Sequence, residues 1–156
     1  MIARTIRIYL DSCCLGRLYD DNAQERVRRE VEAVRAVLRR VRMGEVKLVA
    51  SSMSVVENMR DSSHLRQQGA QLLLDMATVH VDFDDTDIQR AEQLHGMGFG
   101  KADAYHVVAA EKASCDVLLT TDDRLIRKAA QHNQLLQVRV INPVDWAMES
   151  GYDNET

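Results

Sequence analysis

The stretch KADAYHVVAAEKASCDVLLTTD, residues 101–122, decides the fold because it predicts a helix followed by a buried strand. From Lys101 to Ala113, alanine and valine recur at positions that can pack one side of a helix. The strand predicted from Asp116 to Thr121 has the uninterrupted apolar run Val117-Leu118-Leu119 at its centre, which is typical of a strand covered on both faces of a parallel sheet. Such a strand needs neighbouring strands and covering helices from the rest of the chain.

The flanking sequence supplies these elements in alternation. Four further strands are predicted, at 6–10, 47–50, 78–82 and 138–141. Further helices are predicted at 23–43, from 54 onward, at 64–76, at 87–95 and at 123–132. In the first of them, apolar residues recur at the three-and-four spacing of an amphipathic helix, which Gly44 ends. The alternation predicts an α/β fold, a three-layer α/β/α sandwich with a central, mostly parallel five-stranded sheet.

Length and composition set the limits of this prediction. The 156 residues suffice for one domain, which we expect over 1–150, followed by a polar tail at 151–156. No apolar run is long enough to span a membrane, and the N-terminus lacks a signal peptide's apolar block, so we expect a cytoplasmic protein. Cys13, Cys14 and Cys115 lack the C-x-x-C spacing of a zinc site and are expected to be reduced and buried.

Four acidic residues fall where the predicted sheet has its functional edge. Asp11 and Asp122 directly follow predicted strands, while Glu57 and Asp103 are expected in the first turns of their helices. Ligands of parallel sheets bind beyond the carboxyl ends of the strands, so these side chains are expected to lie together. Clustered carboxylates repel one another unless cations neutralise them, and carboxylate oxygens suit Mg²⁺ or Mn²⁺. The sequence therefore indicates a metal site.

Each acid also has a purely structural explanation. Ser54 and Glu57 fit a capping box, Asp103 opposes the positive end of its helix dipole, and Asp122 fits an N-cap. The metal site is favoured only because all four acids fall at one edge.

Four segments of the chain resemble the motifs of the PIN domain, a nuclease family that includes the bacterial VapC-type toxins. Ile8–Ser12 resembles the opening strand with its first aspartate, and Ser52–Glu57 the helix with the family glutamate. Lys101–His106 resembles the D-A-x-H segment, and Leu119–Asp122 the T-x-D segment. The resemblance covers residues 6–142 and depends on the order and spacing of the motifs. One departure is Cys13, where the family often has an asparagine.

The resemblance implies a ribonuclease that cleaves single-stranded RNA by metal-assisted hydrolysis. Asp11, Glu57, Asp103 and Asp122 would be the catalytic residues and the ligands of Mg²⁺ or Mn²⁺. An antitoxin partner, as in type II toxin–antitoxin pairs, and a homodimer are further implications. The formal charge of −4 agrees with an acidic active site. The alternative is a PIN-like binding or assembly module with little or no nuclease activity, which has no need to bind divalent metal.

Several residues near these motifs have either a supporting or a structural role. The set comprises Ser12, Thr120, Thr121, Asp123 and His106. Ser12 either orients Asp11 or belongs to a turn, and Asp123 shares or replaces the role of Asp122. His106 lies on the same helix face as Asp103, where it either contacts substrate or is structural.

The helix at 23–43 is crowded with arginines. Its later part carries Arg35, Arg39, Arg40 and Arg42 without acids to balance them. These side chains either contact RNA phosphates or bind an acidic partner such as an antitoxin. The simpler alternative is a solvated helix face with ion pairs at helical spacing.

Other functions at the edge of a parallel sheet lack their residues here. A phosphoaspartate receiver needs a lysine after the fifth strand, where this chain has Asn142-Pro143. A haloacid-dehalogenase-like phosphatase needs D-x-D after the first strand, where Asp11-Ser12-Cys13 stands. A dinucleotide-binding domain needs G-x-G-x-x-G at the same place, and only Gly16 is present.

Overall fold

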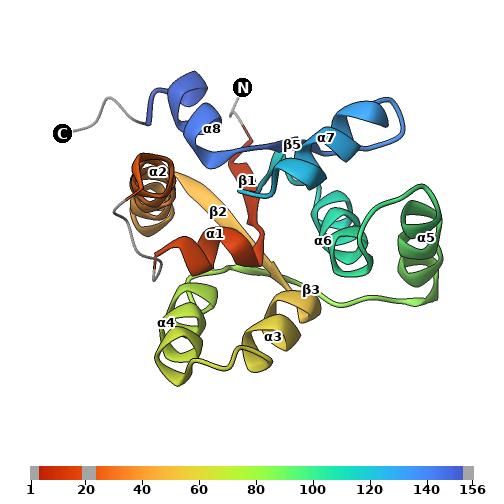
Figure 1. Cartoon of the computed structure of the whole chain (residues 1–156), viewed down its shortest axis with the longest axis horizontal. Helices are drawn as coiled ribbons and strands as arrows, with labels where there is room; N and C mark the ends of the chain where they lie inside the picture. Colours follow the sequence, from red (N-terminus) through yellow and green to blue (C-terminus); the bar gives the residue numbers. More distant parts are fainter. Residues whose placement is uncertain (1–3, 19–23, 153–156) are drawn as a thin grey trace.

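The computed structural model describes residues 4–18 and 24–152. Five strands form one sheet in the order β3-β2-β1-β4-β5, and every neighbouring pair is parallel (Figure 1). The strands are β1 (Ile6–Leu10), β2 (Val46–Ser51), β3 (Val79–Val81), β4 (Val117–Leu119) and β5 (Arg139–Ile141). The predicted five-stranded sheet is confirmed, and it is parallel throughout.

Helices cover both faces of this sheet and give the predicted three layers. They are α1 (Ser12–Arg17), α2 (Glu25–Arg42), α3 (Ser52–Met59), α4 (His64–Leu74), α5 (Asp85–Gly96), α6 (Lys101–Lys112), α7 (Asp123–Gln131) and α8 (Pro143–Ser150). One core contains side chains of α1, α2, α4 and α8, and the other contains side chains of α5, α6 and α7. None of the helices in the described ranges is long and apolar enough to cross a membrane.

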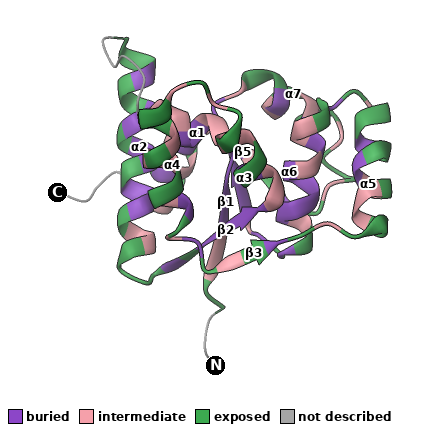
Figure 2. Ribbon diagram, turned by 90° about the horizontal axis from the view of Figure 1, so that it is seen from below, coloured by how far each residue is buried: buried purple, intermediate pink, exposed green. Residues whose placement is uncertain are grey.

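The strands feed both cores because successive side chains point to opposite faces. Ile8 and Leu10 of β1 belong to the core under α2, whereas Tyr9 between them belongs to the core under α6. All three residues of β4 are buried in the same alternation. Figure 2 shows this burial at the centre of the sheet, with exposed residues on the outer faces of α2 and α4. The nearly continuous apolar sequence of β4 therefore reflects a strand covered on both sides.

The strand order places a switch point between β1 and β4. The chain proceeds from β1 to β2 and β3 on one side and then crosses over to β4 on the other side. Ligands of open parallel sheets bind at such a point, outside the carboxyl ends of the strands. The backbone N–H of Asp11, directly after β1, donates to the carbonyl of Leu119 at the end of β4, with an N–O distance of 3.0 Å. The residues that follow these two strands therefore lie side by side.

Two helices were not predicted. α1 begins at Ser12, directly after the residue that follows β1, so Ser12 belongs to a helix rather than to a turn. α8 carries capping signals that the sequence does display. The Asn142 side chain accepts from the N–H of Val144, Pro143 occupies the first turn, and Gly151 adopts a left-handed φ of 78° at the C-cap. Tyr152, expected in the polar tail, is buried. Residues 153–156 lie outside the described ranges.

The capping-box explanation of Glu57 is wrong. The N-cap of α3 is Ser51, whose side chain accepts from the N–H of Ser54 at 3.3 Å. The helix therefore begins at Ser52, two residues earlier than predicted, and Glu57 lies in its second turn. A carboxylate there is too far along the helix to satisfy the free N–H groups at its start. For α2, the structure gives Glu25–Arg42, and Ala23, where we predicted its start, lies outside the described residues.

Candidate metal centre

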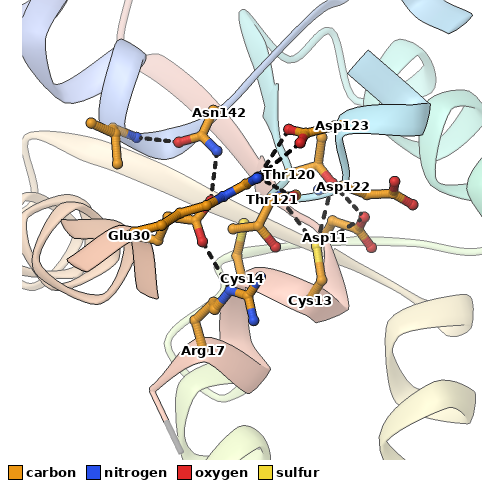
Figure 3. Close-up of polar contacts among 12 residues, drawn as sticks. Asp11, Cys13, Cys14, Arg17, Glu30, Thr120, Thr121, Asp122, Asp123 and Asn142 are labelled. Atoms are coloured by element: carbon orange, nitrogen blue, oxygen red, sulfur yellow. Dashed lines mark hydrogen bonds and ion pairs between the residues drawn. The ribbon is translucent and has the colours of Figure 1, made fainter. Parts of the chain in front are cut away.

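Asp11 lies at the carboxyl end of β1 and is 5% exposed. The Thr120 hydroxyl donates to Asp11 Oδ2 at 2.9 Å and accepts the backbone N–H of Asp122 at 3.1 Å (Figure 3). Asp122 in turn caps α7, since its Oδ1 accepts from the N–H groups of Arg124 and Leu125. The N-cap explanation of Asp122 is confirmed. Thr120 is a direct link between Asp11 and the segment that carries Asp122.

His106 connects Asp11 with Glu57. Its Nε2 contacts Glu57 Oε1 and lies 3.5 Å from Asp11 Oδ1, while its Nδ1 lies 2.6 Å from the Tyr9 hydroxyl. The His106 side chain is 1% exposed, and its contact with substrate stays a prediction. Burial alone lowers the pKa of His106, but the Tyr9 oxygen, Glu57 and Asp11 outweigh burial and hold this pKa well above its ordinary value. The raised pKa favours the imidazolium form of His106, whose charge offsets those of Glu57 and Asp11.

Glu57 is held as a carboxylate by these contacts. Its partial burial raises its pKa, but hydrogen bonding from His106, the charge of His106 and hydrogen bonding from Ser12 bring the pKa below its usual range. Ser12 at the start of α1 thus lowers the pKa of Glu57, a contact that neither of the two expected roles of Ser12 included.

Asp103 shows that negative charge remains in excess at this edge. It lies in the first turn of α6, and its pKa is raised to about 6 by burial and then by the charges of Asp11, Asp122 and Glu57. The glycine before this helix leaves room for the carboxylate, because a Cβ on Gly100 would lie 3.0 Å from Asp103 Oδ2. Asp103 is therefore subject to the negative charge of the other three predicted acids.

The donor chemistry of this edge fits a hard divalent cation. Carboxylate oxygens are the ligands such ions take, and a cation would relieve the repulsion that raises the pKa of Asp103. Within residues 4–18 and 24–152, however, no group of three or more acidic, histidine or cysteine side chains is gathered as closely as a bound ion requires. The role of the four acids as metal ligands stays a prediction.

Cys13, which stands where the family often has an asparagine, lies inside this site. Its Sγ lies 3.4 Å from Asp11 Oδ2 and 3.3 Å from Thr120 Oγ1, and it accepts the backbone N–H of Thr121 at 3.3 Å. Hydrogen bonding with Cys14 lowers the pKa of Cys13 despite its burial. Of the three thiols expected to be buried, Cys14 and Cys115 are, whereas Cys13 is half-buried beside Asp11.

The Asp123 carboxylate pairs with an arginine instead of joining the four predicted acids. Both of its oxygens accept from the Arg26 guanidinium at 2.9 Å, and its side chain is half-exposed. The same guanidinium donates to the backbone carbonyl of Thr121 at 3.2 Å. Asp123 and Thr121 therefore contribute to the site by fixing the segment after β4 to α2.

Glu30 is a buried charge that sequence analysis missed. It is 1% exposed and accepts from Arg17 Nε at 3.0 Å, Arg26 Nε at 3.4 Å and Asn142 Nδ2 at 2.8 Å (Figure 3). Its spacing from Val27, three residues earlier, was the available signal that it lies on the buried face. Through these contacts Glu30 joins α1, α2 and the start of α8.

The arginines in the C-terminal half of α2 lie away from the candidate metal centre. α2 begins beside Asp123 and returns to the opposite edge of the sheet, where β2 starts. From Arg26 to Arg42 the helix rises about 24 Å. Arg35, Arg39 and Arg42 are exposed along this course. Arg40 is engaged internally, since it pairs with Glu45 at 2.6 Å and stacks on the Tyr152 ring at 4.4 Å.

The fold and this edge define an α/β domain with an acidic site at the switch point of a parallel sheet. The family model of the PIN domain matches residues 8–131, and the chain belongs to the PIN domain family. The crystal structure of FitAcB from Neisseria gonorrhoeae is similar, with 20% identity, 87% of this chain and 97% of that chain covered, and a TM-score of 0.56. The structure of VapBC-1 from nontypeable Haemophilus influenzae shows 10% identity, coverage of 88% and 98%, and a TM-score of 0.56. No curated protein sequence matches significantly.

Proposed function

We propose that the protein is a Mg²⁺- or Mn²⁺-dependent ribonuclease that hydrolyses phosphodiester bonds of single-stranded RNA. The observation that carries the proposal is the contact geometry that links Asp11 to the segment of Asp122 through Thr120 and to Glu57 through His106. The pKa of Asp103, raised by burial and then by the charges of Asp11, Asp122 and Glu57, agrees with this arrangement. Perturbed pKa values are concentrated at functional sites, and carboxylates that share a cation lie close enough to raise one another's pKa. Membership of the PIN domain family supports the same activity.

The four acids would hold the cation, and the neighbouring residues would keep them in place. When bound, a divalent cation lowers the pKa of a water ligand and offsets charge on the reacting phosphate. Thr120 fixes Asp11 through its hydroxyl, and His106 orients the carboxylate of Glu57. Thr121 and Asp123 hold the segment around Asp122 through Arg26.

We further propose a protein partner of the antitoxin kind and a homodimer. Support for the partner comes from the similar structures of FitAcB and VapBC-1. For the homodimer, the support is limited to Leu72 of α4, which is 70% exposed, whereas Leu73 and Met76 pack against the core. Arg35, Arg39 and Arg42 would contact either RNA far from the cleaved bond or an acidic segment of the partner.

The test is cleavage of end-labelled single-stranded RNA in Mn²⁺, in Mg²⁺ and in EDTA. Asp103→Asn removes one predicted ligand, and Asp85→Asn is its matched control because Asp85 also lies in the first turn of a helix but is exposed and remote from the site. We expect cleavage that requires metal, disappears in Asp103→Asn and persists in Asp85→Asn. Full activity of Asp103→Asn would refute the mechanism. No cleavage together with no calorimetric heat on adding Mn²⁺ would favour the binding or assembly module.

A further inference from the structure

A cavity of about 520 Å³ lies beside the candidate metal centre, between α1, α3 and α4. Glu57 forms part of its wall, together with Ser12, Cys13 and Thr121 from the same sheet edge. The size is that of a site for a small organic ligand. A group bound in this cavity would therefore adjoin the carboxylates directly.

The lining of the cavity carries Arg60 and Arg66 beside the acidic side chains of Glu57 and Asp61. Arg60, directly after α3, makes no ion pair among the described residues, although its charge lowers the pKa of Glu57. Arg66 of α4 lies 3.8 Å from Asp61 Oδ2, and both side chains are partly exposed, so this pair is weak. Guanidinium groups bind phosphate well, because their N–H groups form two parallel hydrogen bonds with its oxygens.

The interior of the cavity suits the planar body of a base. Leu15, Gly16 and Ala70 contribute apolar surface, and Asn58 contributes a polar group. No atom lies within 4 Å of the place where a Cβ on Gly16 would stand, so the wall is open there. An apolar wall beside cationic groups is the combination that single-stranded nucleic acid binds, with bases packed and phosphates paired.

We propose that this cavity is a nucleotide subsite, in which the nucleotide next to the cleaved bond is held with its phosphate on Arg60 and Arg66. The proposal rests on the proposed function for the identity of the substrate, single-stranded RNA. It adds that binding of the substrate depends on α3 and α4 and not only on the metal. The path of the RNA then crosses the carboxylates from the side of Glu57.

The experiment measures the affinity of the full chain for a labelled single-stranded RNA in EDTA, over a range of salt concentrations. Each of Arg60→Gln and Arg66→Gln is expected to weaken binding and to reduce the salt-dependence slope by about 0.7, the value for one phosphate contact of a single strand. Arg28→Gln and Arg127→Gln, exposed positions on α2 and α7 outside the cavity, are the controls and should keep the slope.

Gly16→Phe tests the interior without changing charge. It fills open space, and we expect binding to weaken about fivefold or more with an unchanged slope, as for loss of one base contact. Thermal unfolding followed by circular dichroism verifies that each variant is folded. Unchanged binding in the folded cavity variants, or equal slope changes in cavity and control arginines, would overturn the subsite. RNA binding that depends on Arg60 without any metal-dependent cleavage would support the subsite and refute the nuclease.

Discussion

Arg26 contacts one buried carboxylate and one half-exposed carboxylate. Comparing variants of the two therefore tests how much burial adds to the stability contributed by an ion pair. The Glu30 side chain is 1% exposed and the Asp123 side chain is 51% exposed, yet both accept hydrogen bonds from the Arg26 guanidinium (Figure 3). Glu30→Gln and Asp123→Asn each replace one carboxylate oxygen by an amide of nearly the same shape. Each variant therefore removes one negative charge that contacts Arg26, from a buried side chain in Glu30→Gln and from an exposed one in Asp123→Asn.

The expected cost of Glu30→Gln follows from its partners. The carboxylate accepts from Arg17 and Arg26, and removing one partner of a buried ion pair costs about 3–5 kcal/mol. Arg17 and Arg26 are 27% and 53% exposed, so water can partly replace the lost contacts, and we expect the lower end, about 3 kcal/mol. Asp123→Asn breaks an exposed pair and should cost below about 1 kcal/mol.

Urea unfolding at pH 7 in EDTA, followed by circular dichroism, measures both free energies of unfolding. In thermal unfolding, a loss of about 3 kcal/mol corresponds to a decrease of about 6–12 °C for a chain of this size. A Glu30→Gln variant as stable as the original protein, or no less stable than Asp123→Asn, would refute the conclusion that burial makes this network a determinant of stability.

Two further predictions concern pH. Because the pKa of Asp103 is raised to about 6, chiefly by burial and then by Asp11 and Asp122, its charge destabilises the metal-free fold increasingly from about pH 4 to 6. Asp103→Asn should therefore raise the melting temperature at pH 7.5 but not at pH 4, and no gain at pH 7.5 would contradict this explanation. The raised pKa of His106 stabilises the folded state, in contrast to that of Asp103. This stabilisation is complete below about pH 6.5 and is lost as pH rises through the higher pKa of His106 in the folded state. His106→Asn should cost most stability at pH 6 and less at alkaline pH, and a cost that is the same across this range would show that the charge of His106 is unimportant.

The sequence determined the strands and the position of the acids that follow them. The pattern that predicts each strand lies within a few consecutive residues, alternating in 6–10 and wholly apolar in 117–119. Such a local pattern can be recognised without knowing which other segments of the chain pack against it. Asp11 and Asp122 were predicted correctly beside the functional edge for the same reason, since each directly follows a strand. Asp103 could be placed from its helix start.

Only the tertiary structure decided which groups meet these acids. His106 reaches Asp11 and Glu57 because α6 packs on the same face as Tyr9, at separations along the chain that no local pattern encodes. Glu30 is buried because Arg17 and Arg26 converge on it, and its charge alone favoured a solvated position. Burying a charged side chain costs free energy unless an opposite charge and hydrogen-bond partners lie beside it. Such partners can come from distant parts of the chain, so only the tertiary structure shows which they are.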